Sequence, residues 1–159
     1  LVHHGGVAMR VAKDWRRAAL QALYILDRGG DPTPETLTAA LEGSAASEAD
    51  RAEGVDFALR TWECGRTLDD ELNPLSPDWP LHRQPVLDRS ILRLAAQEMT
   101  ESPEQWKVVI SEAIDLAREF STEESPRFIN GVLDRLQRER QRNQDQSGEA
   151  DHGIVSPGD

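Results

Sequence analysis

Cysteine is nearly absent from this 159-residue chain, in which Cys64 is the single thiol. One cysteine excludes an internal disulfide bond and a cysteine metal cluster, and it weakly favours a reducing compartment. No stretch approaches the roughly 18 consecutive apolar residues that cross a bilayer, and residues 1–9 lack the apolar core of a signal peptide. We therefore expect a soluble, cytoplasmic protein.

Residues suited to catalysis are equally scarce. His82 is the one histidine outside the first four and the last eight residues, and a lone histidine beside a loop is usually a surface residue. Cys64 falls in an apolar helical pattern, where a cysteine usually serves packing. Gly29 and Gly30 are not followed by the Lys-Ser or Lys-Thr of a phosphate-binding loop. The sequence predicts no enzyme, no metal site and no cofactor.

Carboxylates are abundant, and they give the chain a net charge of -11. Such a charge repels phosphate, so indiscriminate binding to nucleic acid is not expected. The distribution is uneven: residues 10–28 hold five basic and two acidic side chains, whereas residues 31–81 hold three basic and twelve acidic ones. The beginning of the chain is therefore a small basic island, which hints at an anion site. Glu112, Asp115 and Glu119 share one helical stripe, which favours a solvated surface over a site for acid–base chemistry.

Apolar residues recur at helical spacing with clear boundary signals, and no strand pattern stands out. Gly29 and Gly30 can end a helix in the left-handed conformation. Thr33 before Pro34 fits a helix N-cap, and Ser47 with Asp50 resembles a capping box. Together with a short turn around Trp79 and Leu81, the predicted helices span about 12–28, 33–41, 47–72, 85–99, 102–120 and 125–142. This pattern predicts a compact all-α bundle of about seven helices.

Composition divides the chain into three parts. Residues 1–9 are expected to be a flexible start and residues 10–142 a helical domain. Beyond residue 142 the sequence is rich in Gln, Asn, Gly, Ser and Asp and almost lacks apolar residues. Such a composition cannot bury enough apolar surface to fold, so residues 143–159 are predicted to be a disordered acidic tail.

Three segments resemble the signature segments of the NusB family. They are RRAALQALY over 16–24, LDRSILRLAAQEM over 87–99 and KVVISEAIDLAREFSTEESPRFINGVLDRL over 107–136. The resemblance implies an all-α fold of two packed helical subdomains. Within the last segment, Gly131 predicts a close approach between helices and Asn130 a hydrogen bond to a neighbouring backbone. Arg93 lies at the edge of an apolar face, where a helix-surface ion pair is the plainer interpretation.

The resemblance also implies a function without catalysis. Members of the family act in transcription antitermination by binding the boxA element of nascent RNA together with a ribosomal protein that doubles as Nus factor E. The complex joins transcribing RNA polymerase and suppresses premature termination, chiefly on ribosomal RNA operons. The partners expected for this chain are therefore boxA-like RNA, that ribosomal protein and the polymerase complex.

The resemblance places an RNA-binding site at the start of the first helix. Arg10, Lys13, Arg16 and Arg17 are the candidate phosphate ligands, because Lys and Arg neutralise phosphate and Arg binds it bidentately. Asp14 interrupts this cluster, so a modest, salt-dependent affinity is expected. The alternative is a solvated basic face on an amphipathic helix.

A second group of candidate RNA-binding residues follows from the same resemblance. Arg127 at the start of the last helix is placed to meet phosphate with the help of the free N–H groups there. Phe128 is a candidate for stacking on a base, and Tyr24 on the first helix is a candidate for the edge of the RNA site. Core packing is an alternative for both. Glu123 and Glu124 would repel phosphate at this edge.

Two other functions stay open at this point. One is a protein-interaction module with the NusB fold and little RNA binding of its own, which the acidic charge favours because a ribosomal protein is basic. The other is an RNA-guiding domain of an rRNA cytosine methyltransferase, to which NusB-like domains are also fused. That interpretation requires a catalytic domain, and an acidic polar tail follows instead.

Overall fold

The computed structural model describes the backbone of residues 13–151 and the side chains of residues 13–148. Over this range the chain forms seven α-helices and three short 3-10 helices, and no strand. The α-helices are α1 (Asp14–Asp27), α2 (Pro34–Ala40), α3 (Glu48–Glu63), α4 (Gly65–Leu72), α5 (Val86–Glu101), α6 (Trp106–Phe120) and α7 (Ser125–Asp151). The 3-10 helices are η1 (Asn73–Leu75), η2 (Leu81–Arg83) and η3 (Pro103–Gln105).

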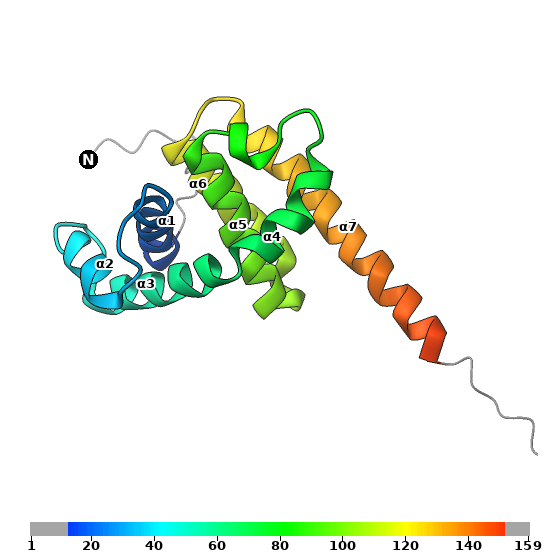
Figure 1. Ribbon diagram of the computed structural model, residues 1–159, viewed down its shortest axis with the longest axis horizontal. Helices are drawn as coiled ribbons and strands as arrows, with labels where there is room; N and C mark the ends of the chain where they lie inside the picture. The colour runs from blue at the N-terminus through cyan, green and yellow to red at the C-terminus, as the bar shows by residue number, and fades with distance from the viewer. Residues whose placement is uncertain (1–12, 152–159) are drawn as a thin grey trace, which may run out of the picture.

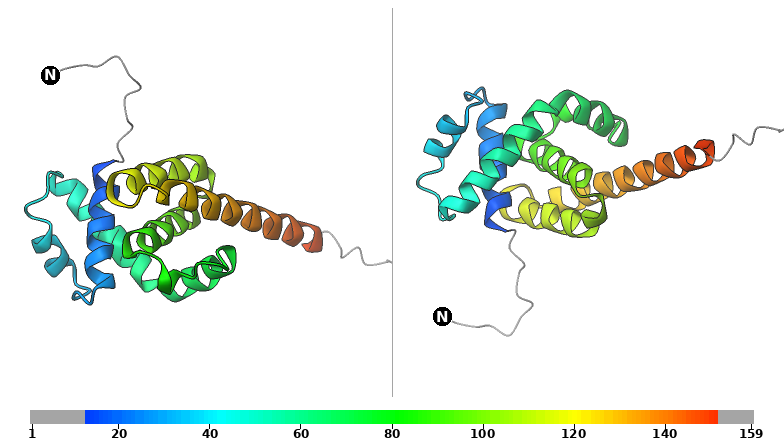
Figure 2. Two further views of the ribbon diagram at one scale, coloured as in Figure 1. Left: turned by 90° about the horizontal axis from the view of Figure 1, so that it is seen from above. Right: turned by 90° about the horizontal axis from the view of Figure 1, so that it is seen from below.

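The helices form two packed groups (Figures 1 and 2). Helix α1 packs most extensively against α3, with α2 beside α3, while α4, α5, α6 and α7 pack on one another. Contacts between α1 and α5 join the groups. Helix α2 lies at one end of the molecule, and the last turns of α7 project from the other (Figure 1). The predicted all-α bundle of two helical subdomains is confirmed.

Most predicted helix boundaries are confirmed by their hydrogen bonds. Gly29 has a φ of 93°, and the Gly29 and Gly30 N–H groups donate to the Leu26 and Ile25 carbonyls at 3.0 and 2.9 Å. This is the Schellman arrangement that ends a helix with a left-handed residue. The Thr33 side chain accepts from the N–H of Thr36 and so caps α2. Ser47 caps α3 in the same way.

The predicted helix over 47–72 is two helices in the structure. Cys64 ends α3 and precedes α4 with a ψ of 4°, and Gly65 follows, a residue that weakens a helix interior by about 1 kcal/mol. Cys64 is partly buried against the core. The predicted turn near Leu81 is the 3-10 helix η2. The count of seven helices therefore holds because the long helix divides, not because this turn becomes an α-helix.

The last helix begins at the predicted residue and extends beyond its predicted end. Helix α7 continues to Asp151, so residues 143–151 are helical although their composition predicts disorder. Polar pairs one turn apart support this segment, such as Gln141 with Asp145 at 3.2 Å, and each contributes a few tenths of a kcal/mol.

Close helix packing occurs at Gly54 and not at Gly131. A Cβ on Gly54 would lie 2.6 Å from the Trp15 carbonyl oxygen, so α1 and α3 approach too closely there for any side chain. A Cβ on Gly131 would meet only the Arg135 guanidinium, at 3.9 Å. Asn130 is exposed. The expectation that Gly131 permits a close approach is therefore wrong, because this side of α7 faces away from the other helices.

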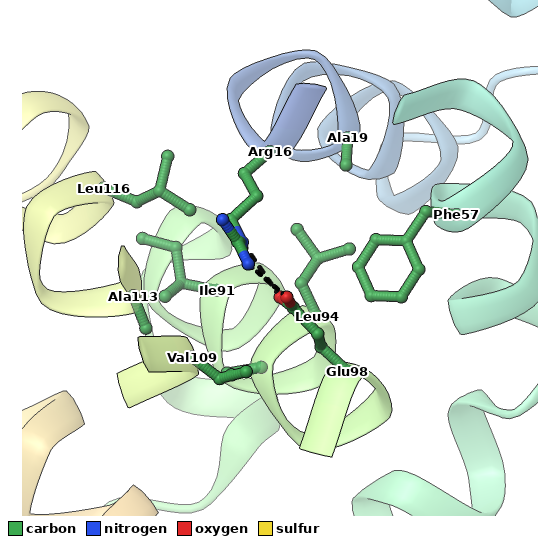
Figure 3. Close-up of a pocket in the computed structure, with 10 residues that line it drawn as sticks. Arg16, Ala19, Phe57, Ile91, Leu94, Glu98, Val109, Ala113 and Leu116 are labelled. Atoms are coloured by element: carbon green, nitrogen blue, oxygen red, sulfur yellow. Dashed lines mark hydrogen bonds and ion pairs between the residues drawn. The ribbon is translucent and has the colours of Figure 1, made fainter. Parts of the chain in front are cut away.

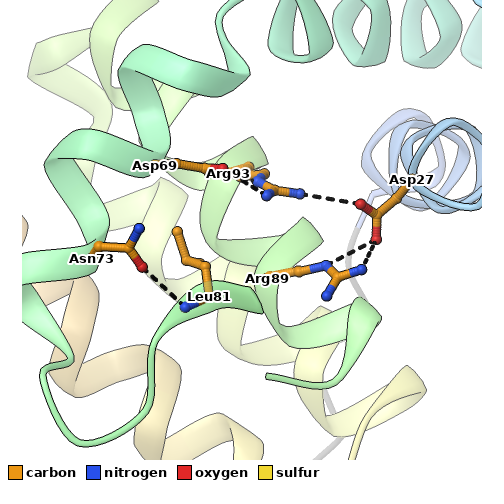
Figure 4. Close-up of polar contacts among 6 residues, drawn as sticks. All are labelled: Asp27, Asp69, Asn73, Leu81, Arg89 and Arg93. Atoms are coloured by element: carbon orange, nitrogen blue, oxygen red, sulfur yellow. Dashed lines mark hydrogen bonds and ion pairs between the residues drawn. The ribbon is translucent and has the colours of Figure 1, made fainter. Parts of the chain in front are cut away.

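An ion-pair network links α1, α4 and α5 (Figure 4). Arg93 donates twice to Asp69, at 2.7 and 2.8 Å, and its Nη1 lies 3.4 Å from Asp27. Arg89 donates to the same Asp27 carboxylate at 2.9 and 2.6 Å. Burial opposes the charged form of Arg93, but the bonds to Asp69 and Asp27 outweigh it and raise its pKa. The expected Arg93 ion pair is thus present, as a half-buried link between the two helical groups.

Candidate nucleic-acid interface

The inner face of α1 holds Arg16, whose guanidinium is bound to carboxylates. Its Nε donates to Glu98 Oε2 at 3.1 Å, and Nη2 donates to the other oxygen of Glu98. Nη1 lies 3.7 Å from Glu112, and the guanidinium lies 4.4 Å from the Trp15 ring centroid. Only 11% of the side chain is exposed. Arg16 therefore joins α1 to α5 and α6, with two hydrogen bonds to Glu98 and a longer ion pair with Glu112.

The surroundings of this ion pair are apolar (Figure 3). Leu94, Val109 and Leu116 line the small cavity of about 10 Å³ beside Arg16. A space of this size holds at most about one water molecule. Water therefore screens the Arg16–Glu98 pair only weakly, and loss of the guanidinium would leave a carboxylate in an apolar setting.

Two carboxylates on α6 are buried, contrary to the expectation of a solvated stripe. Glu112 is 4% exposed and Asp115 is 5% exposed. Glu112 accepts the backbone N–H of Lys13 at 3.0 Å, so it satisfies one of the free N–H groups where α1 begins, although no side chain of α1 itself does so. The stripe is buried because α6 turns it toward α1; of the three carboxylates only Glu119 is exposed.

The outer face of α1 carries a row of polar residues that are exposed or partly exposed. Lys13, Arg17, Gln21, Tyr24 and Arg28 follow one another at spacings of four, four, three and four residues, which places them along one side of the helix. We call these five residues the outer stripe. Lys13, Gln21 and Arg28 are exposed, and the other two are partly exposed. The outer stripe contains three cations and one aromatic ring.

Two of the three cations of the outer stripe stand beside aromatic rings. The Arg17 guanidinium lies 5.7 Å from the Phe120 ring centroid, and that of Arg28 lies 5.5 Å from the Tyr24 ring centroid. Arg17 is also paired with Glu119, and its Nη1 lies 3.5 Å from Asp14. These are partly exposed ion pairs of the kind that contributes less than about 1 kcal/mol, so an incoming anion can replace them.

An open pocket of about 560 Å³ adjoins the outer stripe, and we call it the stripe pocket. Gln21 and Tyr24 of α1, Ser44 of the α2–α3 loop, Leu87 of α5 and Phe120 of α6 are among its lining residues. Tyr24 is thus neither a core residue nor isolated on the surface. Its ring forms part of the wall of the stripe pocket.

The candidate RNA-binding residues at the start of α7, Arg127 and Phe128, do not line this pocket. Phe128 packs against Trp79, with ring centroids 4.8 Å apart, and the two rings line a separate pocket of about 590 Å³ that also contains Arg135. Arg127 is exposed in the first turn of α7, and Glu123 and Glu124 are exposed just before it. Arg10 lies outside the described residues.

Sequence reasoning did not select Arg28 and Phe120 as site residues. Arg28 follows Tyr24 by four residues, so helical spacing alone could have placed it on the same face. Phe120 belongs to an apolar pattern that predicts core, and no signal in the sequence distinguishes a core position from the wall of a pocket. Its place depends on how the end of α6 packs beside α1.

Comparison with known proteins decides the family. The sequence model of the NusB family matches residues 13–138, which include α1 and nearly all the elements described above. The chain belongs to the NusB family. The transcription antitermination protein NusB of Elusimicrobium minutum is 43% identical over 135 residues, a match that covers 81% of this chain and 94% of that protein.

Solved NusB structures agree with the fold. The NusB of T. maritima superposes with a TM-score of 0.68 at 28% identity, covering 82% of this chain and 94% of that one. A chain from the crystal structure of the antitermination factors NusB and NusE in complex with dsRNA gives a TM-score of 0.67 at 20% identity, covering 79% and 94%. The second likeness shows the fold alone. The shared NusB fold therefore positions α1, and with it the outer stripe.

The described residues lack two kinds of feature. None of the helices is both long and apolar enough to span a membrane. Within the same range, no three His, Cys, Asp or Glu side chains gather in a way that could hold a metal ion.

Proposed function

We propose that this NusB-family chain is a transcription antitermination factor that binds boxA-type RNA together with the ribosomal protein that doubles as Nus factor E, in support of ribosomal RNA transcription. Relatives such as that of Elusimicrobium minutum carry the antitermination function in their names. A protein of the same fold has been crystallised with NusE and double-stranded RNA. The chain itself contributes the outer stripe, which is the observation that carries the proposal.

The outer stripe suits a phosphate backbone in charge and spacing. Lys13, Arg17 and Arg28 lie along about 22 Å of helix, given a rise of about 1.5 Å per residue. Arginine and lysine neutralise phosphates and release their counterions, which makes affinity fall steeply with salt. With three such contacts on single-stranded RNA, the logarithm of the affinity should fall with a slope of about -2 against the logarithm of salt concentration. Arg10, just before α1, adds a fourth candidate contact.

The remaining predicted residues have supporting roles in this proposal. Tyr24 stands between Arg17 and Arg28 on the outer stripe, where a base next to the bound phosphates can reach it. Arg127 and Phe128 are proposed as a second contact beyond the α6–α7 turn. Arg16 is proposed to act indirectly, by fixing the orientation of α1 through Glu98.

Binding to RNA alone should be weak, so the ribosomal-protein partner should be needed. The net charge is -11, and Arg17 must first leave Glu119. A basic partner is attracted by the acidic region over residues 31–81 and brings its own positive charge to the RNA. The two proteins then present one surface of which this chain supplies part.

A protein-interaction module with little RNA binding is the second candidate function. The observation that favours it is the pairing of both Arg16 and Arg17 with carboxylates. If these pairs persist in the complex, the start of α1 carries almost no free positive charge, and the chain would contribute to antitermination through protein contacts alone.

RNA binding measured with and without the partner separates these candidates. A labelled single-stranded boxA-type RNA is titrated with the protein, with the ribosomal protein, and with both together. The double variant Arg17→Glu plus Arg28→Glu is measured beside the control Arg138→Glu plus Arg142→Glu. The control makes the same change in charge at two exposed arginines of α7, whose side chains are 73% and 62% exposed.

The proposal predicts tight binding only with both proteins present, and a loss of at least about tenfold in the outer-stripe variant. The α7 control should retain its affinity within about twofold. Formation of the protein complex without any contribution to RNA affinity from this chain would contradict the proposal and leave the interaction module.

A further inference from the structure

We propose that the stripe pocket takes a single unstacked nucleobase of the bound RNA, and that Ser44 and Gln21 form hydrogen bonds to the edge of this base. The inference rests on the proposed function and adds to it a place where the chain reads sequence. It concerns the α2–α3 loop, which none of the RNA-binding predictions included.

The walls of the stripe pocket match a flat aromatic ligand. Leu20, Ile25 and Leu87 contribute apolar surface, while Tyr24 and Phe120 contribute rings. Sequence-specific RNA recognition commonly places an unstacked base against aromatic side chains. The volume of about 560 Å³ lies within the range of roughly 300–1,000 Å³ that small ligands occupy. A base with part of its ribose therefore fits this space.

A buried hydroxyl indicates that the occupant is polar at one edge. Ser44 lines the stripe pocket, and its Oγ is buried without a hydrogen-bond partner in the described structure. Leaving such a group unsatisfied costs about 1–3 kcal/mol. An aliphatic side chain of a protein partner would leave that cost in place, whereas the edge of a base can bond to the hydroxyl once the Ser44 side chain turns toward the stripe pocket, because its oxygen is covered in the free protein. Gln21 is exposed on the outer stripe and offers both a donor and an acceptor.

Charge at the border of the stripe pocket indicates that the occupant is also anionic. Arg17 stands over the Phe120 ring and Arg28 over the Tyr24 ring, so each aromatic wall has a cation beside it. An aromatic ligand with a phosphate on either side satisfies both features, and a nucleotide within an RNA chain has this composition. The geometry thus selects RNA over an apolar peptide.

The test replaces each nucleotide of the boxA-type RNA in turn with an abasic ribose and measures affinity in the complete complex with the ribosomal protein. One position should lose about tenfold or more, because stacking of a base contributes about 1–3 kcal/mol. Gly43→Leu fills the stripe pocket from its edge, where an added Cβ meets no atom within 4 Å. In this variant the abasic substitution at the sensitive position should no longer lower the RNA affinity.

Two further variants make the result specific. Gly65→Leu is the matched control, since a Cβ there also meets nothing within 4 Å and Gly65 lies outside the stripe pocket; it should keep the wild-type abasic profile. Ser44→Ala should change which base is preferred at the sensitive position and leave the preferences elsewhere intact. An unchanged preference in Ser44→Ala would overturn its role in reading the base.

A separate experiment distinguishes failure of the inference from failure of the proposed function. Uridine, cytidine, adenosine and guanosine 5′-monophosphates are titrated into the isolated protein, and amide NMR shifts are followed at Ser44 and Tyr24. Shifts that disappear in Gly43→Leu would support the base site even if long RNA does not bind. If RNA binds, but no abasic position lowers the affinity and no such shifts occur, the base site is overturned. The proposed function would still stand. If Gly43→Leu instead weakens binding of the ribosomal protein without RNA, the stripe pocket holds the partner and the inference is wrong.

Discussion

Arg16 and Arg17 are adjacent in sequence and differ completely in structure. Arg16 faces inward, with 11% of its side chain exposed, and holds Glu98 within an apolar cavity. Arg17 faces outward with 33% exposed, and its partners Glu119 and Asp14 are themselves at the surface. The same residue type therefore serves stability on one face of α1 and remains available to a ligand on the other.

The difference shows how a basic cluster in sequence divides in a folded helix. Successive residues of an α-helix point about 100° apart, so at most half of a dense cluster can share one face. In α1 the inward arginine, Arg16, meets acidic residues of α5 and α6. The outward positions, together with Tyr24 and Arg28, form the outer stripe. Counting basic residues overestimates the charge that RNA can reach, and the pattern at spacings of three and four describes it better.

The largest expected effect comes from removing the inner guanidinium. Arg16→Met leaves Glu98 and Glu112 without their cation in an apolar setting, which should lower the free energy of unfolding by about 3 kcal/mol. Arg17→Met should lower it by less than about 1 kcal/mol, because its ion pairs are partly exposed. Urea denaturation followed by circular dichroism measures both. Similar losses of unfolding free energy in the two variants would contradict the distinction between the inner and outer faces of α1.

The next effect concerns the packing that fixes the orientation of α1. Gly54→Ala places a Cβ 2.6 Å from the Trp15 carbonyl oxygen, so α1 and α3 must separate at a cost of about 1–3 kcal/mol. Gly131→Ala is the matched control on the exposed side of α7. It should stabilise the protein by up to about 1 kcal/mol, because alanine favours helix. Thermal and urea unfolding of both variants measure these opposite changes in stability. A Gly54→Ala variant with unchanged stability would contradict the close approach of α1 and α3.

A smaller effect on RNA affinity is expected when Glu119, which competes with RNA phosphate for Arg17, is neutralised. Glu119→Gln frees the guanidinium at low salt, and the affinity for boxA-type RNA in the partner complex should rise about two- to fivefold. Glu139→Gln, which releases Arg142 on α7, should leave the affinity unchanged. Fluorescence anisotropy at fixed salt compares the two. An equal rise in both variants would indicate a general charge effect and not a local one.

The smallest effect is a pH dependence at a surface pair. Arg60 donates to Glu101 at 3.1 and 3.0 Å, and these bonds hold the pKa of Glu101 below its usual value despite some burial. A lowered pKa in the folded state stabilises the protein above the usual pKa, and this contribution is lost as pH falls through the folded-state value. Arg60→Gln should therefore cost a few tenths of a kcal/mol at pH 7, and this cost should shrink and disappear as pH falls through the lowered pKa of Glu101. A cost that persists at low pH would exclude this ion pair as its source.

Local signals in the sequence predicted much of the fold. Thr33, Ser47 and Gly29 mark helix ends through their own backbone and side-chain bonding, which depends on few distant contacts. The break at Cys64 was missed because apolar spacing continues through it. The length of α7 was missed because composition takes no account of pairs one turn apart, such as Gln141 with Asp145. The role of Gly54 depends on where α1 crosses α3, which no local pattern contains.

The candidate site was predictable only in part. Lys13, Arg17 and Tyr24 were selected by resemblance and lie on one face. The fate of Arg16 depends on Glu98 and Glu112, which are more than eighty residues away and reach it only once α5 and α6 are packed. The Ser44 loop carries no sequence signal of its own. Long-range packing therefore decides which of the selected residues a ligand can meet.

The salt dependence of RNA affinity tests the central claim, that the outer face of α1 binds phosphate while the inner arginine is structural. The affinity of the partner complex for boxA-type RNA is measured from about 50 to 300 mM salt for the wild type, Arg16→Gln and Arg17→Gln, at a temperature where all three are folded. Loss of one phosphate contact makes the negative slope less steep by up to about 1. We predict a slope that is less steep in Arg17→Gln and unchanged in Arg16→Gln. A less steep slope in Arg16→Gln together with an unchanged slope in Arg17→Gln would contradict the account.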